Sequence, residues 1–509
     1  KFCITEYGKD KILGSFPISD LDLLRLELDH LDETKNLLIQ YENIPFENFG
    51  DVKPKLHKSL IENAILSPEE ILTILNLLRL SRTMRSFISS KSEEFPLLWN
   101  EAKELYENRL LEKHIRDTLD ESGNVRDSAS RELSRIRKEI IEKSAKLRRR
   151  INQILKSVAE EELIQDEFIT LREGRFVIPI KVENKNKVSG IIHGVSQTGS
   201  TVFVEPAEVI EMNNELSLLQ NEERREIYRI LQNLTKEIGN EAYSLLNSVE
   251  ILTHIDSLLA KAKYSLKFNC LKPEILDRKE IYLQEIRHPI LVHNRGLKEV
   301  VPLTIEFTQS KRGHLISGPN AGGKTVALKS IGLNIALALS GFFPLGYCKT
   351  SYFSIFTSIG DLQSIENDLS TFSSQILRLK TILDFSDTNS LILIDEIGSG
   401  TDPQEGSALA SAILESFLNL NSFFVATTHH SYLKTYALSK SEIENDSLEF
   451  DEHYLKPTYR FLQGVPGNSY AFELATWLGL SPHIIKNAKN FLGQSHSHLD
   501  ETLRTLYRL

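Results

Sequence analysis

A glycine-rich stretch in the second half of the chain constrains its fold more than any other feature. Residues 318–325 read Gly-Pro-Asn-Ala-Gly-Gly-Lys-Thr, a full match to the pattern G-x-x-x-x-G-K-[ST]. An apolar run at 314–316 precedes it, and a helical pattern at 326–338 follows it. A strand, a glycine-rich loop and a helix in this order form a P-loop, whose backbone N–H groups surround phosphate oxygens. The sequence therefore predicts an α/β domain with an ATP site made by Gly318, Pro319, Asn320, Ala321, Gly322, Gly323, Lys324 and Thr325.

A second motif supplies carboxylates for this site. The apolar run 391–394 is typical of a strand buried on both faces, and Asp395 and Glu396 follow it directly. We expect Lys324 to reach the β- and γ-phosphates, and Thr325 and Asp395 to hold Mg²⁺. Glu396 would orient the attacking water, because phosphoryl transfer depends on positioning and electrostatics. An acidic pair at a strand end carries little information alone, but beside a P-loop it indicates ATP hydrolysis.

A third apolar run, 423–426, ends in Thr427, Thr428, His429 and His430. A lone histidine at a strand end is more often structural. Beside the two motifs above, His429 is the better candidate for sensing the γ-phosphate. Glu396, Lys324 and His429 are therefore the predicted catalytic residues.

The first half of the chain has a different character. Residues 1 to about 165 read as almost entirely helical, and apolar residues recur at helical spacing over 131–158 and again over 216–238. At a rise of about 1.5 Å per residue, each of these helices would run about 40 Å. Short β-rich runs separated by turn residues lie between them, at 168–171, 176–180, 191–192 and 201–204. Such a small sheet lies either at the tip of a helical arm or packed on the body, and the pattern favours neither.

Composition excludes several classes of protein. The chain of 509 residues has a net charge of −10, so any attraction to nucleic acid must come from local patches. Three widely spaced cysteines, Cys3, Cys270 and Cys348, suggest neither a disulfide framework nor a zinc site. Polar and turn residues interrupt the apolar stretch 331–348, which indicates a core helix followed by a turn rather than a membrane span.

Two local basic segments are candidates for phosphate contact. Over 131–150, nine Lys or Arg residues accompany three Glu residues, and a solvated helix face is the more common explanation of such a run. The turn 184–187, Asn-Lys-Asn-Lys, is the second candidate, because these side chains contact backbone phosphates without reading sequence. Farther on, residues 458–491 read as helices joined by a turn at 478–482. The first residue is Lys, which suggests a processed or trimmed chain.

The motifs together resemble those of the MutS family. The resemblance rests on the P-loop form Gly-Pro-Asn-x-Gly-Gly-Lys at 318–324, the extended segment 395–401, the Ser-Thr-Phe at 370–372 and the pair Thr428-His429. It implies a homodimer that uses ATP and Mg²⁺, in which Ser370 of one subunit meets the γ-phosphate bound by the other. It also implies that the two long helices are lever arms with a clamp for nucleic acid at their tip.

Within the family, the segments 199–206, 211–216, 400–406 and 427–430 resemble the second bacterial branch, and the likeness covers nearly the whole chain. That resemblance implies a dimeric ATPase that binds branched or recombination-type DNA and suppresses homologous recombination. The alternative is a ribosome-binding ATPase that splits stalled or collided ribosomes through contacts with rRNA. A structural arm protein of the chromosome-condensing kind is disfavoured, because the interval from Thr325 to Asp395 is too short for its long coiled coil.

Two features depart from the family's pattern. The mismatch-reading type carries N-terminal domains with a Phe-x-Glu wedge, whereas here the helical pattern starts near residue 1. The tripeptide occurs at 203–205 and 450–452, places that do not fit a wedge, so mismatch reading is not expected. The second branch usually continues into an Smr nuclease domain, and no segment here resembles one. We therefore expect no nuclease activity from this chain.

The complete prediction is a mixed architecture. It has an all-α core and lever domain at 1–165 and 216–280, a β-rich clamp insertion at 166–215, and an ABC-type P-loop ATPase domain at 281–509 with a helical dimerisation segment, a helix-turn-helix, from about 458. The protein is expected in the bacterial cytoplasm, associated with the nucleoid or the ribosome and not with a membrane. The predicted nucleic-acid contacts are Lys181, Lys185, Lys187, Arg148, Arg149 and Arg150.

Overall fold

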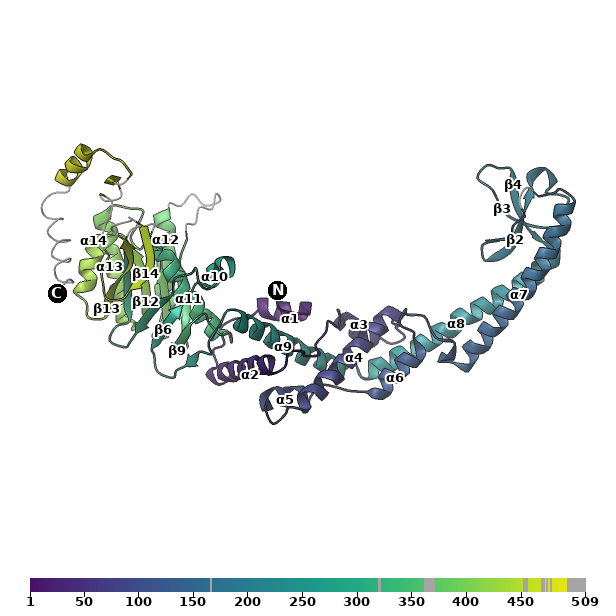
Figure 1. Cartoon of the computed structure of the whole chain (residues 1–509), viewed down its shortest axis with the longest axis horizontal. Helices are drawn as coiled ribbons and strands as arrows, with labels where there is room; N and C mark the ends of the chain where they lie inside the picture. Colours follow the sequence, from purple (N-terminus) through teal and green to yellow (C-terminus); the bar gives the residue numbers. More distant parts are fainter. Residues whose placement is uncertain are drawn as a thin grey trace. The chain divides into compact units, whose positions relative to one another are not determined.

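Two compact units make up the chain (Figure 1), as seen in a computed structural model that describes residues 1–164, 167–318, 322–360, 371–451, 456–467, 472, 475–476 and 478–491. Unit 1 comprises residues 1–3, 8–44 and 255–509, and unit 2 comprises residues 4–7 and 45–254. Two helices, α1 (Glu6–Leu13) and α9 (Ala242–Lys267), run across the boundary between the units. Helices and sheets occur together, as the sequence predicts.

Unit 2 is mostly helical, and its helices begin at residues suited to helix starts. Ser67 and Glu70 form a reciprocal capping box at the start of α4, with Pro68 in the first turn. The Ser130 side chain accepts the N–H of Leu133 at the start of α7. The elements before the insertion are α3 (Lys53–Ser59), α4 (Pro68–Ser89), α5 (Pro96–Ala102), α6 (Arg109–Thr118), η1 (Asp127–Ala129) and α7 (Arg131–Glu160).

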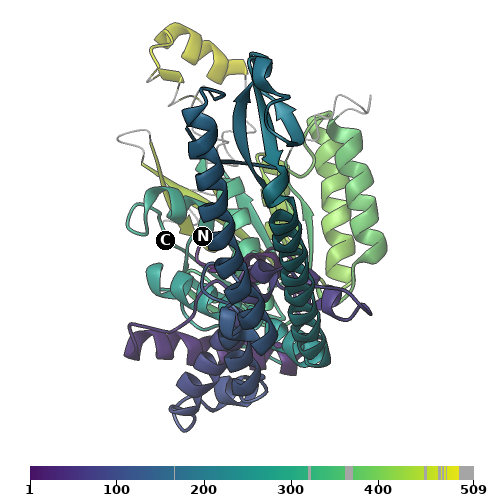
Figure 2. The ribbon, with the colours of Figure 1, turned by 90° about the vertical axis from the view of Figure 1, so that its right-hand side faces the viewer.

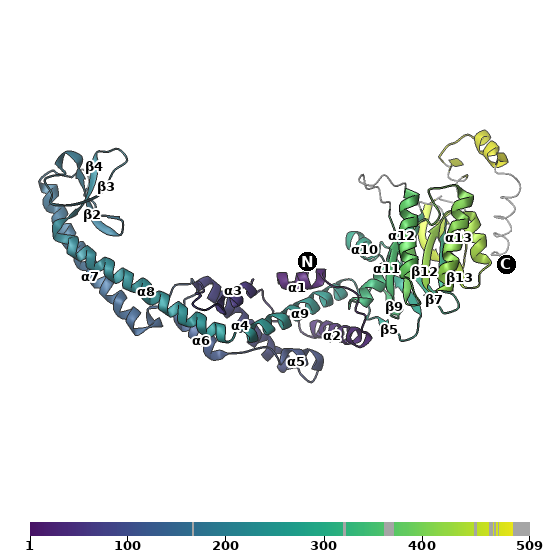
Figure 3. The same cartoon turned by 180° about the vertical axis from the view of Figure 1, so that it is seen from behind.

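A four-stranded antiparallel sheet interrupts the helices of unit 2 between α7 and α8 (Ile210–Asn240). The two helices lie side by side and the sheet lies at one end of the pair (Figures 2 and 3). Of the two arrangements that the sequence leaves open, unit 2 thus has the arm. The sheet, here called the insertion sheet, has the order β1-β2-β4-β3. Its elements are β1 (Thr170–Arg172), β2 (Arg175–Lys181), η2 (Val182–Asn184), β3 (Gly190–Val195), β4 (Thr201–Pro206) and η3 (Ala207–Val209).

A local apolar core fixes the insertion sheet to the end of α7. Leu147, Ile151 and Ile154 on α7 pack with Ile178 on β2 and Val204 on β4, and all five are buried. These residues recur at helical spacing on α7 and at alternate positions on the strands, so each element offers one apolar face to the same core. Burial of apolar area of this kind is the main favourable term in folding.

Unit 1 contains a six-stranded sheet of order β10-β11-β12-β8-β13-β14, which is parallel except for the last pair. Apolar side chains from α12, α13 and α14 pack on the face that carries Ile392 and Phe424. On the opposite face, Gly332 of α11 lies against Leu393. The sheet is therefore covered on both sides, as is usual for parallel strands. Its elements are β8 (Gly313–Ser317), α11 (Lys324–Leu339), β10 (Ser354–Ser358), α12 (Thr371–Phe385), β11 (Ser390–Ile394), α13 (Pro403–Asn419), β12 (Phe423–Thr428), α14 (Ser431–Leu438), β13 (Ile443–Asp451) and β14 (Lys456–Leu462).

A second sheet of unit 1 has the order β5-β9-β6-β7. The buried pair His314–Asp446, with Nδ1 and Oδ2 2.7 Å apart, joins β8 to β13 within the larger sheet. The remaining elements of this unit are α2 (Leu21–Gln40), β5 (Glu274–Ile275), β6 (Ile281–Ile286), α10 (Pro289–Arg295), β7 (Leu303–Phe307) and β9 (Tyr347–Thr350).

Three details of the predicted layout differ from the structure. Helix was predicted from about residue 458, but 456–462 form strand β14, because this segment pairs with β13 and buries Phe461. A helix does follow at 482–491. Helix α8 begins at Ile210, inside the range predicted as β-rich, and strand β5 lies inside a range predicted as helical. The division into a lever domain, a clamp insertion and an ATPase domain stays a prediction.

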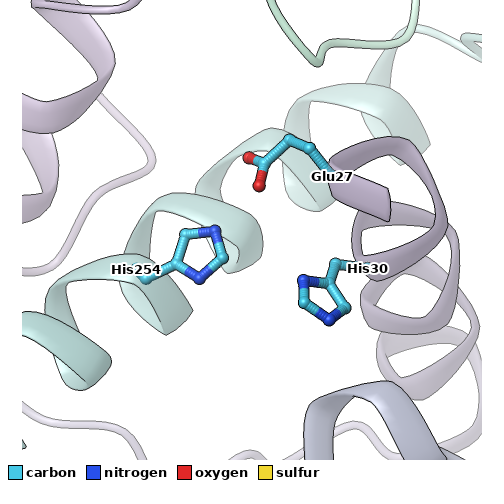
Figure 4. A group of neighbouring side chains, drawn as sticks. All are labelled: Glu27, His30 and His254. Carbon is cyan, nitrogen blue, oxygen red and sulfur yellow. The ribbon is translucent and has the colours of Figure 1, made fainter. Parts of the chain in front are cut away.

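Polar side chains on α2 and α9 are drawn in Figure 4. Within unit 1, Glu27 accepts a hydrogen bond from Lys261 Nζ at 2.7 Å. Within unit 2, His254 Nδ1 lies 2.6 Å from Glu101 Oε1. Each of these two groups thus has a partner inside its own unit.

Among the helices of the described residues, we find none that combines the length and the apolar character needed to cross a bilayer.

Candidate functional site: a P-loop centre and a basic insertion

Parallel strands bring the predicted ATP-site motifs together at one sheet edge. Strand β12 lies between β11 and β8, and Thr428 pairs with Ser317 at the carboxyl ends of β12 and β8. The P-loop follows β8, Asp395 follows β11 and His429 follows β12. Ligands of open α/β sheets bind at this edge.

The described part of the P-loop has the conformation that glycine permits. Gly318 has φ +138° and Gly323 has φ +93°, both in the region that side chains disfavour. Lys324 starts α11, is only 3% exposed, and donates from Nζ to the carbonyl oxygen of Gly318 at 2.5 Å. Burial lowers the pKa of the Lys324 ammonium, and the carboxylates of Glu396 and Asp395 oppose this shift. Gly322 is buried beside them, whereas Pro319, Asn320 and Ala321 lie outside the described residues.

Thr325 and Asp395, the two predicted metal ligands, are in direct contact. The Thr325 hydroxyl donates to Asp395 Oδ2 at 2.8 Å. Thr427 Oγ1 donates to the other carboxylate oxygen, Oδ1, at 2.6 Å. A hydroxyl and a carboxylate are the hard oxygen donors that Mg²⁺ prefers. This donor pair fits the predicted metal.

Glu396 is held in an unusual backbone conformation next to these groups. Its φ is +49°, and its N–H donates to Thr427 Oγ1 at 2.7 Å. From α12, the side-chain amide of Gln375 donates to the carbonyl oxygen of Asp395 at 3.0 Å. Roles for Thr427 and Gln375 were not predicted. Thr427 stands in a segment that the sequence had singled out, whereas nothing in the pattern marked Gln375.

His429 lies at the same edge, and its ring centroid is 4.3 Å from that of His430. Partial burial and the neighbouring His430 and Lys324 hold the pKa of His429 below its ordinary value, against the pull of Glu396. This shift favours the neutral imidazole over the charged form. Tyr459 on β14 contacts the P-loop, since a Cβ on Gly323 would meet its ring at 3.0 Å. Ser370, the residue predicted to act in trans, lies outside the described residues.

The predicted nucleic-acid contacts belong to unit 2. Lys185 and Lys187 are exposed between β2 and β3 of the insertion sheet. Lys181 is half-buried and donates to the carbonyl oxygen of Glu162 at 3.2 Å. On α7, Arg148, Arg149 and Arg150 are exposed. Of these, the Arg148 guanidinium lies 5.4 Å from the Phe176 ring centroid, and Arg150 pairs with Glu208.

Much of the basic run on α7 is already paired. Arg135 contacts Glu132 and Glu139 on its own helix. Arg137 Nε lies 2.7 Å from Glu223 Oε1, and Lys143 Nζ lies 2.6 Å from Glu215 Oε2, both across to α8. These pairs agree with the more common explanation of such a run, a solvated helix face. Of the six predicted contacts, Arg149, Lys185 and Lys187 are exposed and have no ion pair among the described residues.

A buried carboxylate organises the insertion sheet. Glu205 on β4 is 0% exposed and accepts hydrogen bonds from Arg175 Nη1 at 2.7 Å and Asn213 Nδ2 at 2.9 Å. Its other oxygen lies 2.7 Å from His193 Nε2 on β3. Since Asn213 belongs to α8, this cluster joins three strands to the arm. Glu205 and Asn213 belong to two segments that the sequence had marked only by resemblance, 199–206 and 211–216.

Comparisons with known proteins agree with this geometry. Residues 314–495 match the family model described as MutS domain V. An Endonuclease MutS2 of Pelotomaculum thermopropionicum is 39% identical over 505 residues, which cover 98% of this chain and 63% of that protein. Proteins of the same name from Staphylococcus carnosus and Clostridioides difficile are each 37% identical, over 99% and 98% of this chain and 65% and 63% of their own lengths.

The chain thus spans less than two thirds of the length of these relatives. The word "endonuclease" in their names describes the longer proteins. Identity nevertheless extends along nearly the whole of this chain, through the helical unit, the insertion sheet and the P-loop unit. Over nearly its whole length the chain is thus similar to proteins of the MutS2 type, and residues 314–495 match the domain V of the MutS family.

Proposed function

We propose that the chain binds ATP with Mg²⁺ and hydrolyses it at the carboxyl edge of the six-stranded sheet. The observation that carries this proposal is the convergence of Lys324 and Thr325, after β8, with Asp395 and Glu396, after β11, on either side of β12. These residues come from two sequence motifs about 70 residues apart, and chance rarely brings such motifs to one edge.

Each side chain has a distinct task in this proposal. Lys324 is buried beside two carboxylates, so its charge is directed at the β- and γ-phosphates rather than at solvent. When bound through Thr325 and Asp395, Mg²⁺ neutralises charge on the phosphate oxygens. Glu396 orients the attacking water and accepts its proton. His429 donates a hydrogen bond to the γ-phosphate.

The test is Mg²⁺-dependent release of phosphate from ATP by the purified chain and by Lys324→Ala. The variant should lose tight ATP binding or its productive use, because the phosphates lose their cationic partner. Absence of turnover in the unaltered chain, or equal turnover in the variant, would contradict the proposal.

The second part of the proposal concerns a nucleic acid. The arm of α7 and α8 ends in a small sheet that presents Lys185 and Lys187, and phosphate contacts from such residues bind without sequence preference. We propose that this region grips branched or recombination-type DNA and that the chain suppresses homologous recombination. The name of the relatives, endonuclease, refers to cleavage of a nucleic acid and supports a nucleic-acid ligand, while the choice of DNA follows from the family resemblance. Binding to rRNA and splitting of ribosomes is the second candidate, since phosphates of both nucleic acids suit the same lysines.

The nucleic acid that co-purifies from cells separates these two candidates. Genomic DNA bound to the chain, released by salt, supports the first. Ribosomal RNA in its place supports the second. A control is the variant in which Lys181, Lys185 and Lys187 are each replaced by Glu. If neither nucleic acid co-purifies above the level found with that variant, both candidate functions are contradicted.

We further propose that the chain acts as a homodimer with two shared ATP sites. Ser370 of one subunit would face Lys324 of the other, as the family resemblance implies. Ser370→Arg should then impair hydrolysis although its own P-loop is intact. Mixing it with the Lys324→Ala chain can restore at most one composite site. An isolated monomer that hydrolyses ATP at the full rate would contradict this arrangement.

A further inference from the structure

One buried hydroxyl is bonded to both carboxylate-bearing residues of the candidate site. Thr427, at the end of β12, is 0% exposed. Its Oγ1 accepts the N–H of Glu396 at 2.7 Å and donates to Asp395 Oδ1 at 2.6 Å. Its carbonyl oxygen accepts the N–H of Ile397 at 3.0 Å. Three consecutive residues of the acidic motif are therefore each tied to one threonine on the neighbouring strand.

The Glu396 turn depends on these bonds. A φ of +49° is disfavoured for any residue with a Cβ, so surrounding contacts must hold it. The bond from the Glu396 N–H to Thr427 fixes one side of the turn. On the other side, Gln375 Nε2 donates to the carbonyl oxygens of Asp395 and Glu396 at 3.0 and 3.4 Å. Without the Thr427 hydroxyl, the Glu396 N–H would lose its partner, and a relaxing backbone would redirect the carboxylate.

The same hydroxyl also orients Asp395. Because Oδ1 accepts the Thr427 hydroxyl, Oδ2 is the oxygen directed at Thr325, 2.8 Å away. The hydroxyl uses its single proton on Asp395 and its lone pair on the Glu396 N–H. Only a group that donates one hydrogen bond and accepts another can hold both residues. Serine has such a hydroxyl, and valine does not.

We propose that Thr427 is a positioning residue for ATP hydrolysis that sets the geometry of Glu396 and Asp395 together. This inference rests on the proposed ATPase function of the same site. It assigns to Thr427 an effect on turnover that acts through Glu396 and, in part, through Asp395. If the hydroxyl had only a structural role in the core, its removal would lower the stability of the protein but would leave the turnover of the folded protein unchanged.

The test compares Thr427→Val and Thr427→Ser with the unaltered chain, each also combined with Glu396→Gln. Thr427→Val should lower kcat about 10- to 100-fold, since small misplacements of catalytic groups cost that much, and should change KM for ATP less than threefold. Thr427→Ser should retain turnover within about threefold, because it keeps the bonding atom. Thr350→Val, at another buried threonine of unit 1, is the matched control and should leave kcat unchanged.

The Glu396→Gln background decides whether Thr427 acts through Glu396. There, Thr427→Val should reduce the residual turnover by a clearly smaller factor than in the unaltered background, because only the effect through Asp395 remains. An equal reduction in both backgrounds, or undiminished kcat in Thr427→Val, would overturn the inference. If Thr427→Val does not fold, failure of Thr427→Ser to retain turnover would overturn it equally. Absence of turnover in the unaltered chain would instead refute the ATPase proposal, and amide exchange at Glu396 in Thr427→Ala would then decide whether the hydroxyl holds the turn.

Discussion

The P-loop centre of unit 1 and the insertion sheet of unit 2 organise polar side chains in opposite ways. In the P-loop centre, functional groups face one another across hydrogen bonds at the ends of parallel strands, as Thr325, Asp395 and Thr427 do. In the insertion sheet, the best-ordered polar cluster is internal, centred on Glu205. The cations proposed to touch a ligand, Lys185 and Lys187, lie outside it and are exposed.

This difference follows from what each region would bind. Hydrolysis needs a few atoms placed to a fraction of an ångström, so a rigid sheet and buried partners are required. A grip on phosphate backbones needs positive charge on a stable platform, and exposed lysines supply it with little geometric demand. We therefore expect single substitutions to act strongly in the first region and only groups of substitutions to act strongly in the second.

Asp395→Asn should have the largest effect. The amide keeps the shape of the side chain but removes the charge that would hold Mg²⁺ with Thr325, so Mg²⁺-dependent ATP turnover should fall at least about 100-fold. Steady-state phosphate release over a range of Mg²⁺ concentrations measures it. Asp384→Asn, at an exposed carboxylate on α12, is the control and should be silent. If ATP turnover falls only modestly and excess Mg²⁺ fully restores it, the P-loop centre does not depend on exact placement of this carboxylate.

The variant in which Lys181, Lys185 and Lys187 are all replaced by Glu should have the next largest effect. Affinity for branched DNA or for ribosomes should fall about 30-fold at low salt, and the slope of log affinity against log salt should become shallower by about 2 to 3. Basal ATP turnover should stay within twofold. Titration at several salt concentrations gives both quantities.

A matched triple variant separates local contact from total charge. Lys103, Lys113 and Lys236 are exposed lysines of unit 2 outside the insertion, and reversing them changes the net charge equally. Equal weakening by the two triple variants would mean that the insertion has no special role. Unchanged affinity for both ligands in the first variant would place the grip elsewhere on the chain.

Glu205→Gln should have a smaller effect. It should loosen the insertion sheet, and it should not remove a charge that contacts the nucleic acid. It weakens the bonds to Arg175 and His193, which at about 1–2 kcal/mol corresponds to roughly tenfold more frequent opening of the sheet. Hydrogen exchange of the β3 amides reports this opening. Glu183→Gln, on an exposed side chain of the same insertion, should leave exchange unchanged. Unaltered β3 exchange in Glu205→Gln would show that the buried cluster does not hold the strand.

Much of the fold could be predicted from local sequence patterns. Helix α7 was predicted over 131–158 and spans 131–160, since its apolar spacing is regular and Ser130 caps it. Each of the four strands of the insertion sheet overlaps one of the β-rich runs predicted from the sequence and extends beyond it. The segment 456–462 was predicted wrongly, because its strand exists through pairing with β13, a contact that local composition does not encode.

The candidate site divides in the same way. Motif residues such as Lys324 and Asp395 were predicted, because the P-loop chemistry fixes both residue type and spacing. Thr427 was not assigned a role, since its partners on the next strand depend on sheet register. The partners of Arg137 and Lys143 were not predicted either, since these ion pairs depend on how α7 packs on α8.

Glu396→Gln under single-turnover conditions tests the central claim, that this P-loop centre hydrolyses ATP, most directly. Chain in excess over labelled ATP and Mg²⁺ separates binding from cleavage in one sample. The variant should bind ATP within a few-fold of the unaltered chain and cleave it at least about 100-fold more slowly, because the attacking water loses its base. Glu405→Gln, an exposed carboxylate on α13, should cleave at the full rate. Cleavage by Glu396→Gln as fast as by the unaltered chain would contradict the account.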